Sequence, residues 1–181
     1  MTYCEYVNNL STEDTNPNID YHNNHYGFPI DDDNELFERL VLEINQAGLS
    51  WITILKKQKN FQKAYNNFDI LTVASYGEKD CERLLNDPGI IRNKLKINAA
   101  IHNANVILEL QKAHGSFKNW LDMNHPLTKD EWVKLFKKNF KFVGGEIVNE
   151  FLMSSGYLSG SHTADCPIYQ KILNAKPAWN K

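Results

Sequence analysis

The sequence is poor in cysteine and has no long hydrophobic run. It holds three cysteines in 181 residues, an odd number that argues against a disulfide framework and for thiols that are free or bind a metal. The longest apolar run, residues 49–55, is interrupted by Ser50 and Thr53 and is too short to cross a bilayer. No secretory signal is visible either, so we expect a cytoplasmic protein without a membrane partner.

Patterns typical of strands, repeats and linkers are also missing. No segment alternates apolar and polar residues as a half-buried strand does, and no tract rich in Pro, Gly or Ser divides the chain. The net charge of −2 excludes no nucleic-acid partner, because a basic stripe can coexist with an acidic remainder. We therefore expect one all-α domain over residues 1–181, with looser chain at residues 10–18 and in the last dozen residues.

Apolar residues recur at helical spacing along most of the chain. Between Asp33 and Ala47 they fall three and four residues apart, and the acidic run 31–33 supplies cap candidates and negative charge at the helix start. Similar stripes predict helices at residues 61–68, 80–85, 94–112, 129–138 and 145–155.

Two pairs of cysteine and histidine lie far apart in the sequence. His162 and Cys166 form one pair, and Cys4 and His22 form the other. Two cysteines and two histidines can enclose a zinc ion in a closed, structural site. Spacing alone leaves a chance pairing open, because nothing local joins Cys4 to His22. The third cysteine, Cys81, falls in an amphipathic helix, where a buried thiol is typical.

The stretch ERLLNDPGIIRNKLKINAAI, residues 82–101, resembles two helices joined by a hairpin. A tight turn at Gly89 would expose backbone N–H groups to a phosphate, and the next helix begins with Arg92, Lys94 and Lys96. We predict DNA contacts from Gly89, Arg92 and Lys94. A plain corner of a helical bundle with solvated basic residues fits the same pattern.

The stretch LEINQAGLSWITILKK, residues 42–57, places an acidic group on an apolar helix face. Glu43 lies at the edge of that face, where a carboxylate is costly unless it is paired or used. Gly48 then ends the helix, and Leu49 and Trp51 follow. A carboxylate, an aromatic ring and an apolar wedge are the parts needed to flip a base, hold it and fill the gap. A helical corner whose Leu and Trp pack in the core is the competing interpretation.

The stretch YHNNHYG, residues 21–27, offers two further aromatic side chains. Tyr21 and Tyr26 are candidates for pocket walls beside the candidate metal ligand His22. Ordinary loop aromatics would fit the same pattern.

Taken in order, these stretches resemble the motifs of the DNA-3-methyladenine glycosylase I family, within the helix-hairpin-helix glycosylase superfamily. The resemblance runs over residues 4–166 and is carried by Cys4, YHNNHYG, LEINQAGLSW with ITILKK, GIIRNKLKI, FKFVG at residues 140–144, and the final His-x-x-x-Cys. The block LEINQAGLSW is highly specific. The chain departs from the family at Asn23, His25 and Tyr26, where acidic residues and a tryptophan are usual.

The resemblance implies a helix-hairpin-helix DNA glycosylase fold with the hairpin at about residues 80–101. It implies one structural zinc ion (Zn2+) per chain, which joins segments 4–22 and 162–166 through Cys4, His22, His162 and Cys166. It also implies a monomeric enzyme that flips 3-methyladenine out of alkylated double-stranded DNA and hydrolyses its N-glycosidic bond without a lyase step. Glu43 is then the catalytic residue, and the substrate contacts are Tyr21, Tyr26, Gly48, Leu49 and Trp51.

Other interpretations stay open at this point. A non-catalytic hairpin module that binds DNA or senses damage would explain the changes at residues 23–26, although the presence of Glu43 argues against it. A lyase would need a hairpin lysine as nucleophile; Lys94 is near, but the following helix offers no partner aspartate. A zinc enzyme would need an open coordination position, which four protein ligands do not leave.

Overall fold

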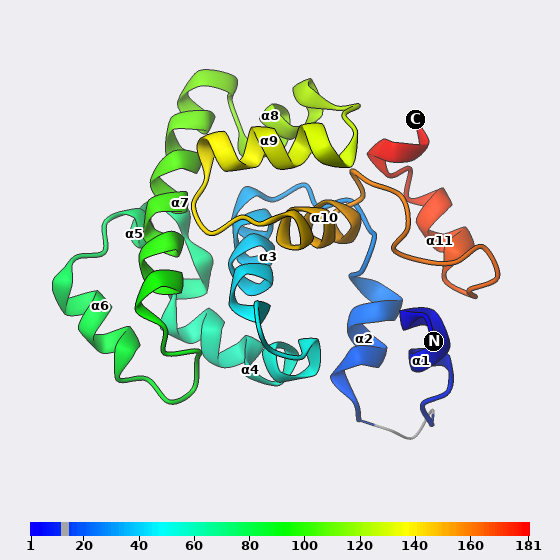
Figure 1. Ribbon diagram of the computed structural model, residues 1–181, viewed down its shortest axis with the longest axis horizontal. Coiled ribbons are helices and arrows are strands. Elements are labelled where there is room, and N and C mark those ends of the chain that lie inside the picture. The colour runs from blue at the N-terminus through cyan, green and yellow to red at the C-terminus, as the bar shows by residue number, and fades with distance from the viewer. Residues whose placement is uncertain (12–14) are drawn as a thin grey trace.

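Helices form the architecture of the protein in a computed structural model that describes residues 1–11 and 15–181. The long helix α3 (Asp33–Gln46) runs through the centre and packs against α7 (Lys94–His114) and α10 (Gly145–Ser154) (Figure 1). No strand occurs among the described residues, so the predicted all-α class is confirmed for this part of the chain. The other α-helices are α1 (Tyr3–Asn8), α2 (Pro17–Asn24), α4 (Trp51–Ala64), α5 (Ile70–Ala74), α6 (Glu78–Leu85), α8 (Phe117–Asn124), α9 (Lys129–Asn139) and α11 (Tyr169–Asn174), with short 3₁₀ helices at Asn66–Phe68 and Ala178–Asn180.

The longer helices begin and end where capping residues in the sequence place them. The Asp32 carboxylate accepts a hydrogen bond from the Glu35 N–H at 2.9 Å, and Asn93 accepts one from the Lys96 N–H at 3.1 Å. Helix α7 stops at Gly115, whose φ of 87° is readily adopted only by glycine. The predicted helices at residues 94–112, 129–138 and 145–155 match α7, α9 and α10 to within two residues at each end.

Two expectations about local structure are wrong. The stripe at residues 61–68 does not form one helix, because α4 ends at Ala64 and the chain then turns through Asn66 and Asn67 with φ values of 51° and 53°. The last dozen residues are not loose, because most of them lie in α11 or in the 3₁₀ helix Ala178–Asn180. A helix this short gives no clear periodic pattern and depends on tertiary packing instead.

The predicted loose segment at residues 10–18 is tested only in part. Residues 12–14 lie outside the described residues, and Pro17 and Asn18 already belong to α2. Proline at the first helical position lacks only an N–H that the helix could not satisfy, so it favours a helix start here.

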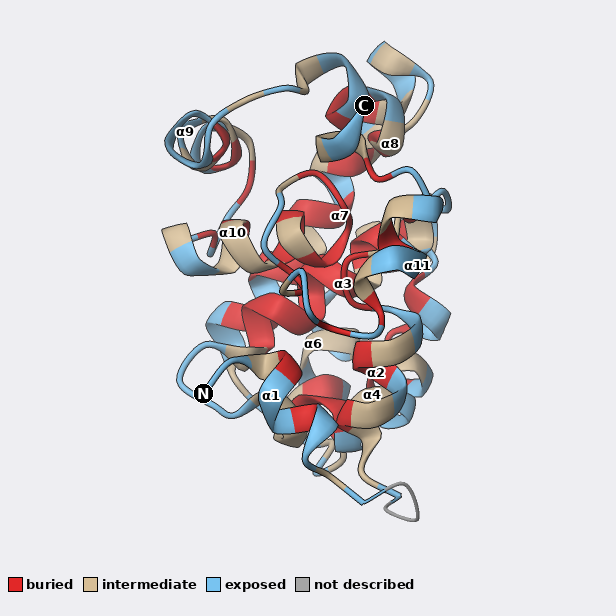
Figure 2. Cartoon of the chain, turned by 90° about the vertical axis from the view of Figure 1, so that its right-hand side faces the viewer, coloured by how far each residue is buried: buried red, intermediate tan, exposed pale blue. Residues whose placement is uncertain are grey.

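The main core is rich in aromatic rings and is packed around α3. Phe37, Trp132, Phe136 and Phe151 are completely buried within it, and buried residues line the inner faces of the helices (Figure 2). A second, smaller cluster joins Cys4 to Cys166, Ile168 and Ile172 where α1, α2 and α11 gather on one side of the molecule (Figure 1). None of the described helices has the length and apolar character needed to cross a membrane.

Asp33 ties the start of the central helix to the start of α8. Its carboxylate accepts hydrogen bonds from the Phe117 N–H at 2.8 Å, the Lys118 N–H at 3.0 Å and the Gln111 side chain at 2.7 Å. The first N–H groups of a helix have no partner within the helix, and a negative charge there is also favoured by the helix dipole. One carboxylate therefore holds three parts of the chain together.

We predict that Asp33→Ala lowers the free energy of unfolding by about 2 to 4 kcal/mol, because half-buried backbone donors lose a charged acceptor. Chemical denaturation monitored by circular dichroism measures this change. The matched control is Asp31→Ala, which removes an exposed carboxylate 3.7 Å from the Lys118 ammonium and should leave stability nearly unchanged. Equal stability of the two variants would contradict the assignment.

Candidate active site

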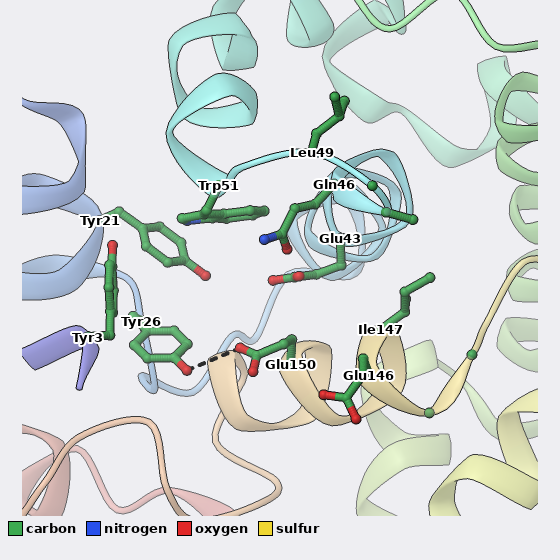
Figure 3. Close-up of a pocket in the computed structure, with 14 residues that line it drawn as sticks. Tyr3, Tyr21, Tyr26, Glu43, Gln46, Leu49, Trp51, Glu146, Ile147 and Glu150 are labelled. Carbon is green, nitrogen blue, oxygen red and sulfur yellow. Dashed lines mark hydrogen bonds between the residues drawn. The ribbon is translucent and has the colours of Figure 1, made fainter. Parts of the chain in front are cut away.

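A cavity of about 720 Å³ opens between α2, the corner joining α3 to α4, and the start of α10. All six residues predicted to contact or process a substrate line it: Tyr21, Tyr26, Glu43, Gly48, Leu49 and Trp51 (Figure 3). They come from two separate stretches of the sequence, residues 21–27 and 42–57, and the fold brings them to one place.

Glu43 contributes a carboxyl group near the end of α3. The residue is 4% exposed, and its carboxyl makes no hydrogen bond within the described part of the chain. Burial and the nearby Glu150 carboxyl raise the pKa of Glu43 to about 8, whereas the Arg39 guanidinium acts in the opposite direction. The ionised form of a buried carboxyl group with a raised pKa is strongly stabilised by a cation that enters the cavity.

Aromatic rings form the wall beside Glu43. The Tyr21 and Trp51 ring centroids are 5.0 Å apart, and Tyr26 lies 5.6 Å from Tyr21 and 5.4 Å from Tyr3. The Arg39 guanidinium lies 5.1 Å from the centroid of Tyr21 and steadies that ring. Burial raises the pKa of Tyr21 and Tyr26, so both rings stay neutral and present electron-rich faces.

The corner between α3 and α4 exposes an apolar side chain at the cavity rim. Gly48 has a φ of 82°, and Leu49 is 41% exposed. Just before Leu49 in the sequence, the carbonyl oxygens of Asn45 and Ala47 accept hydrogen bonds from the Lys96 ammonium at 2.9 Å and 2.8 Å. These bonds fix the end of α3. The competing interpretation, in which Leu49 and Trp51 both pack in the core, holds only for Trp51: Leu49 is exposed, whereas Trp51 is partly buried and packs against the core.

Sequence reasoning missed several residues of this cavity. Tyr3, Gln46, Glu146 and Glu150 also line it. The Tyr26 hydroxyl donates a hydrogen bond to Glu150 at 3.2 Å, which brings a second carboxylate into the site. The available signal was the i, i+4 spacing of Glu146 and Glu150, which places both on one face of α10.

The four predicted metal ligands meet in one buried cluster. Their ligand atoms all lie within 4.8 Å of one another, and Cys4, His22, His162 and Cys166 are each at most 6% exposed. The Sγ–N distances are 3.6 Å for Cys4 and His162, 3.6 Å for Cys166 and His22, and 3.4 Å for Cys166 and His162. Bonds of about 2.0 to 2.3 Å in a tetrahedral zinc site place ligand atoms roughly 3.3 to 3.8 Å apart, so these three distances fit such an ion.

The imidazole groups of this cluster are already oriented for a metal. The Nε2 atom of His162 donates to the Tyr26 carbonyl oxygen at 2.8 Å, and Nδ1 of His22 lies 2.7 Å from the Asn23 side-chain oxygen. The opposite ring nitrogens face the thiols. Burial lowers the pKa of both histidines, that of His162 to about 4, so both rings are neutral as metal binding requires.

The hairpin between α6 and α7 differs in detail from the sequence expectation. Arg92 and Lys94 are exposed, but Lys96 is buried against the end of α3. Gly89 does not offer a free N–H, because that group donates to the Asp87 carboxylate at 2.8 Å. A side chain at Gly89 would start 3.1 Å from Asn60, so close packing is the reason for glycine here.

Comparison with known proteins agrees with this geometry. Residues 11–134 match the methyladenine glycosylase family. The chain is 38% identical to DNA-3-methyladenine glycosylase 1 of Escherichia coli K12, over 83% of this chain and 90% of the relative, and 35% identical to DNA-3-methyladenine glycosylase of Haemophilus influenzae, over 82% and 90%.

A solved structure shows the same fold. A tyrosine-to-phenylalanine variant of 3-methyladenine DNA glycosylase I in complex with 3-methyladenine superposes with a TM-score of 0.80 at 30% identity, over 93% of this chain and 97% of that one. The matches in sequence and in structure lead to one conclusion: this chain belongs to the methyladenine glycosylase family of enzymes.

Proposed function

We propose that this protein is a monofunctional DNA glycosylase that flips 3-methyladenine out of alkylated double-stranded DNA and hydrolyses its N-glycosidic bond. The observation that carries the proposal is the buried, unpaired carboxyl group of Glu43 in a cavity walled by aromatic rings. A structure of similar fold contains bound 3-methyladenine, which supports this class of ligand.

The chemistry of the substrate explains this combination of residues. An adenine methylated at N3 in DNA carries a positive charge, so its glycosidic bond is weak and its departure needs no proton from the protein. The faces of Tyr21 and Trp51 attract a cationic ring. An entering cation also favours the ionised form of Glu43, which then stabilises both the base and the positive charge that develops on the sugar.

Leu49 supplies the wedge that base flipping needs. Removing a base from a duplex leaves an unstacked gap, and an inserted apolar side chain compensates part of that cost. Lys96 joins the start of α7 to the chain just before Leu49. The hairpin residues Arg92 and Lys94 can therefore hold the phosphate backbone while Leu49 enters the stack.

The lysines of the chain do not favour a lyase step. A lyase requires an amine that reaches the sugar carbon at the pocket. Among the described residues that line the cavity there is no lysine. Lys96, the buried lysine of the hairpin, is engaged by two carbonyl oxygens.

We further propose that residues 1–181 act as one domain in which one zinc ion joins the amino-terminal and carboxyl-terminal segments through Cys4, His22, His162 and Cys166. When bound, the ion would supply a structural cross-link and would leave no open position for water. Tyr21 lies beside the ligand His22, and the ligand His162 donates to the Tyr26 carbonyl oxygen, so the cross-link would hold this part of the aromatic wall in place.

The first test measures single-turnover release of 3-methyladenine from methylated duplex DNA. We expect Glu43→Gln to lose about 1 to 3 kcal/mol of transition-state stabilisation, the scale of one charge-assisted hydrogen bond, and Trp51→Ala to lose a comparable amount. Cys81→Ala is the control and should act like the unmutated protein. No release by the unmutated protein would favour a non-catalytic DNA-binding module instead.

The same Glu43→Gln variant should be more stable than the unmutated protein at alkaline pH. The pKa of Glu43 is raised from 4.5 to about 8 on folding, so the unmutated protein loses stability as pH rises through that window. Thermal melting from pH 5 to pH 9 should show a difference in melting temperature between the two proteins that grows with pH. A constant difference would mean that Glu43 is not a buried, unpaired acid.

The second test concerns the metal. Protein purified without chelators should contain about one equivalent of zinc, and Cys166→Ser should lose zinc and melt at a lower temperature. Cys81→Ser is the matched control, because Cys81 lies outside the cluster and should keep both properties. Full zinc content in Cys166→Ser would refute the ligand set.

The third test concerns the hairpin. Lys94→Gln should weaken binding to duplex DNA of any sequence and reduce the salt slope of the affinity by roughly one. Lys171→Gln removes another exposed lysine, on α11, and should change neither quantity. Equal behaviour of the two variants in a salt titration would show that the hairpin does not bind phosphate.

A further inference from the structure

Helix α10 places a second acidic group in the cavity. Glu146 and Glu150 lie one helical turn apart and both line the cavity, on the side facing Glu43 (Figure 3). The two are not equivalent. The Glu146 side chain is 87% exposed and lies 3.4 Å from the Lys129 ammonium, whereas Glu150 is partly buried.

One oxygen of Glu150 is held and the other is available. The Tyr26 hydroxyl donates to Oε2 at 3.2 Å, while Oε1 makes no hydrogen bond within the described part of the chain. Tyr26 itself is 7% exposed and is fixed by its edge-on contact with Tyr3 and by the bond from His162 to its carbonyl oxygen. The carboxylate is therefore oriented toward the cavity by a rigid neighbour.

Two carboxyl groups from different helices, Glu43 buried and Glu150 partly buried, thus face the same cavity. Such a pair is unfavourable in an empty site, because like charges repel and neither is fully solvated. In agreement with this, the Glu150 carboxyl helps to raise the pKa of Glu43. Neither carboxyl has a cationic side chain as its hydrogen-bond partner in the described structure. A cationic ligand would relieve both costs together.

We propose that Glu150 is a second substrate-recognising carboxylate, which lies against a positively charged purine from the side opposite Glu43 and sets the preference for cationic over neutral bases. The inference rests on the proposed function and deepens it. Tyr26 is one of the positions where this chain departs from its family's usual element, and its hydroxyl group is what positions Glu150. The Tyr26–Glu150 pair therefore gives this pocket a source of charge selectivity that the sequence motifs did not reveal.

The experiment compares two ligands that differ chiefly in charge. The permanently cationic 3,9-dimethyladeninium ion has the charge of the damaged base with a methyl group in place of the sugar, and 9-methyladenine is its neutral counterpart. Dissociation constants for both are measured by calorimetry with the full-length protein and its variants. Single-turnover release of 3-methyladenine from methylated duplex DNA is measured in parallel.

We expect Glu150→Gln to weaken binding of the cation by about tenfold and to leave binding of 9-methyladenine unchanged, because the amide keeps the shape but not the charge. Tyr26→Phe should weaken cation binding less, and it should have no further effect once Glu150→Gln is present. Glu109→Gln, an exposed residue on α7, is the matched control for loss of one carboxylate and should bind both ligands normally.

The outcomes separate this inference from the proposed function. If the unmutated protein prefers the cation and Glu150→Gln keeps that preference, the role of Glu150 is refuted while the proposed function stands. Equal weakening of both ligands in Glu150→Gln would also refute it, since that pattern indicates a structural role. If the unmutated protein neither prefers the cation nor releases 3-methyladenine, the proposed function fails and this inference fails with it.

Discussion

The burial of the Glu43 carboxyl group is the constraint on which the rest of the pocket depends. Taking a carboxylate out of water is costly, and the described structure gives it no hydrogen bond in return. The nearest guanidinium, that of Arg39, is occupied with the Tyr21 ring and the Ser154 carbonyl oxygen. The fold therefore buries a carboxyl group at the cavity without a hydrogen-bond partner among the described residues. Unfavourable burial of this kind is typical of functional sites rather than of cores.

Tyr26 contacts both the cysteine and histidine cluster and this pocket. Its carbonyl oxygen accepts from His162, its ring packs against Tyr3, and its hydroxyl group holds Glu150. The next residue, Gly27, permits the connection, because a Cβ atom there would lie 2.2 Å from the Ser161 hydroxyl. The cluster is thus joined to the pocket through one tyrosine.

The sequence predicts the long helices well, and it predicts the site unevenly. Periodicity places α7 and α10 because many residues share one pattern, whereas α11 is too short to show one. The cysteine and histidine spacing was ambiguous, because contacts across 144 or 158 residues leave no local trace. The sequence does not show that Lys96 is buried, because the carbonyl oxygens that accept from it belong to residues 45 and 47, far away along the chain. Glu150 was missed because a glutamate on a helix becomes unusual only when Tyr26 and Glu43 are seen beside it.

The long sequence separation within the cluster sets an order of events during synthesis. Cys4 and His22 leave the ribosome well before His162 and Cys166, to which they are joined across 158 and 144 residues. Domains tend to assemble from the amino terminus as the chain emerges, but here the first segment made must wait for the last. Tyr26 is therefore translated early, whereas His162, which donates to its carbonyl oxygen, is translated late. A nascent chain that stops before residue 162 carries Glu43 and the aromatic residues of the pocket without the histidine that donates to the Tyr26 carbonyl oxygen.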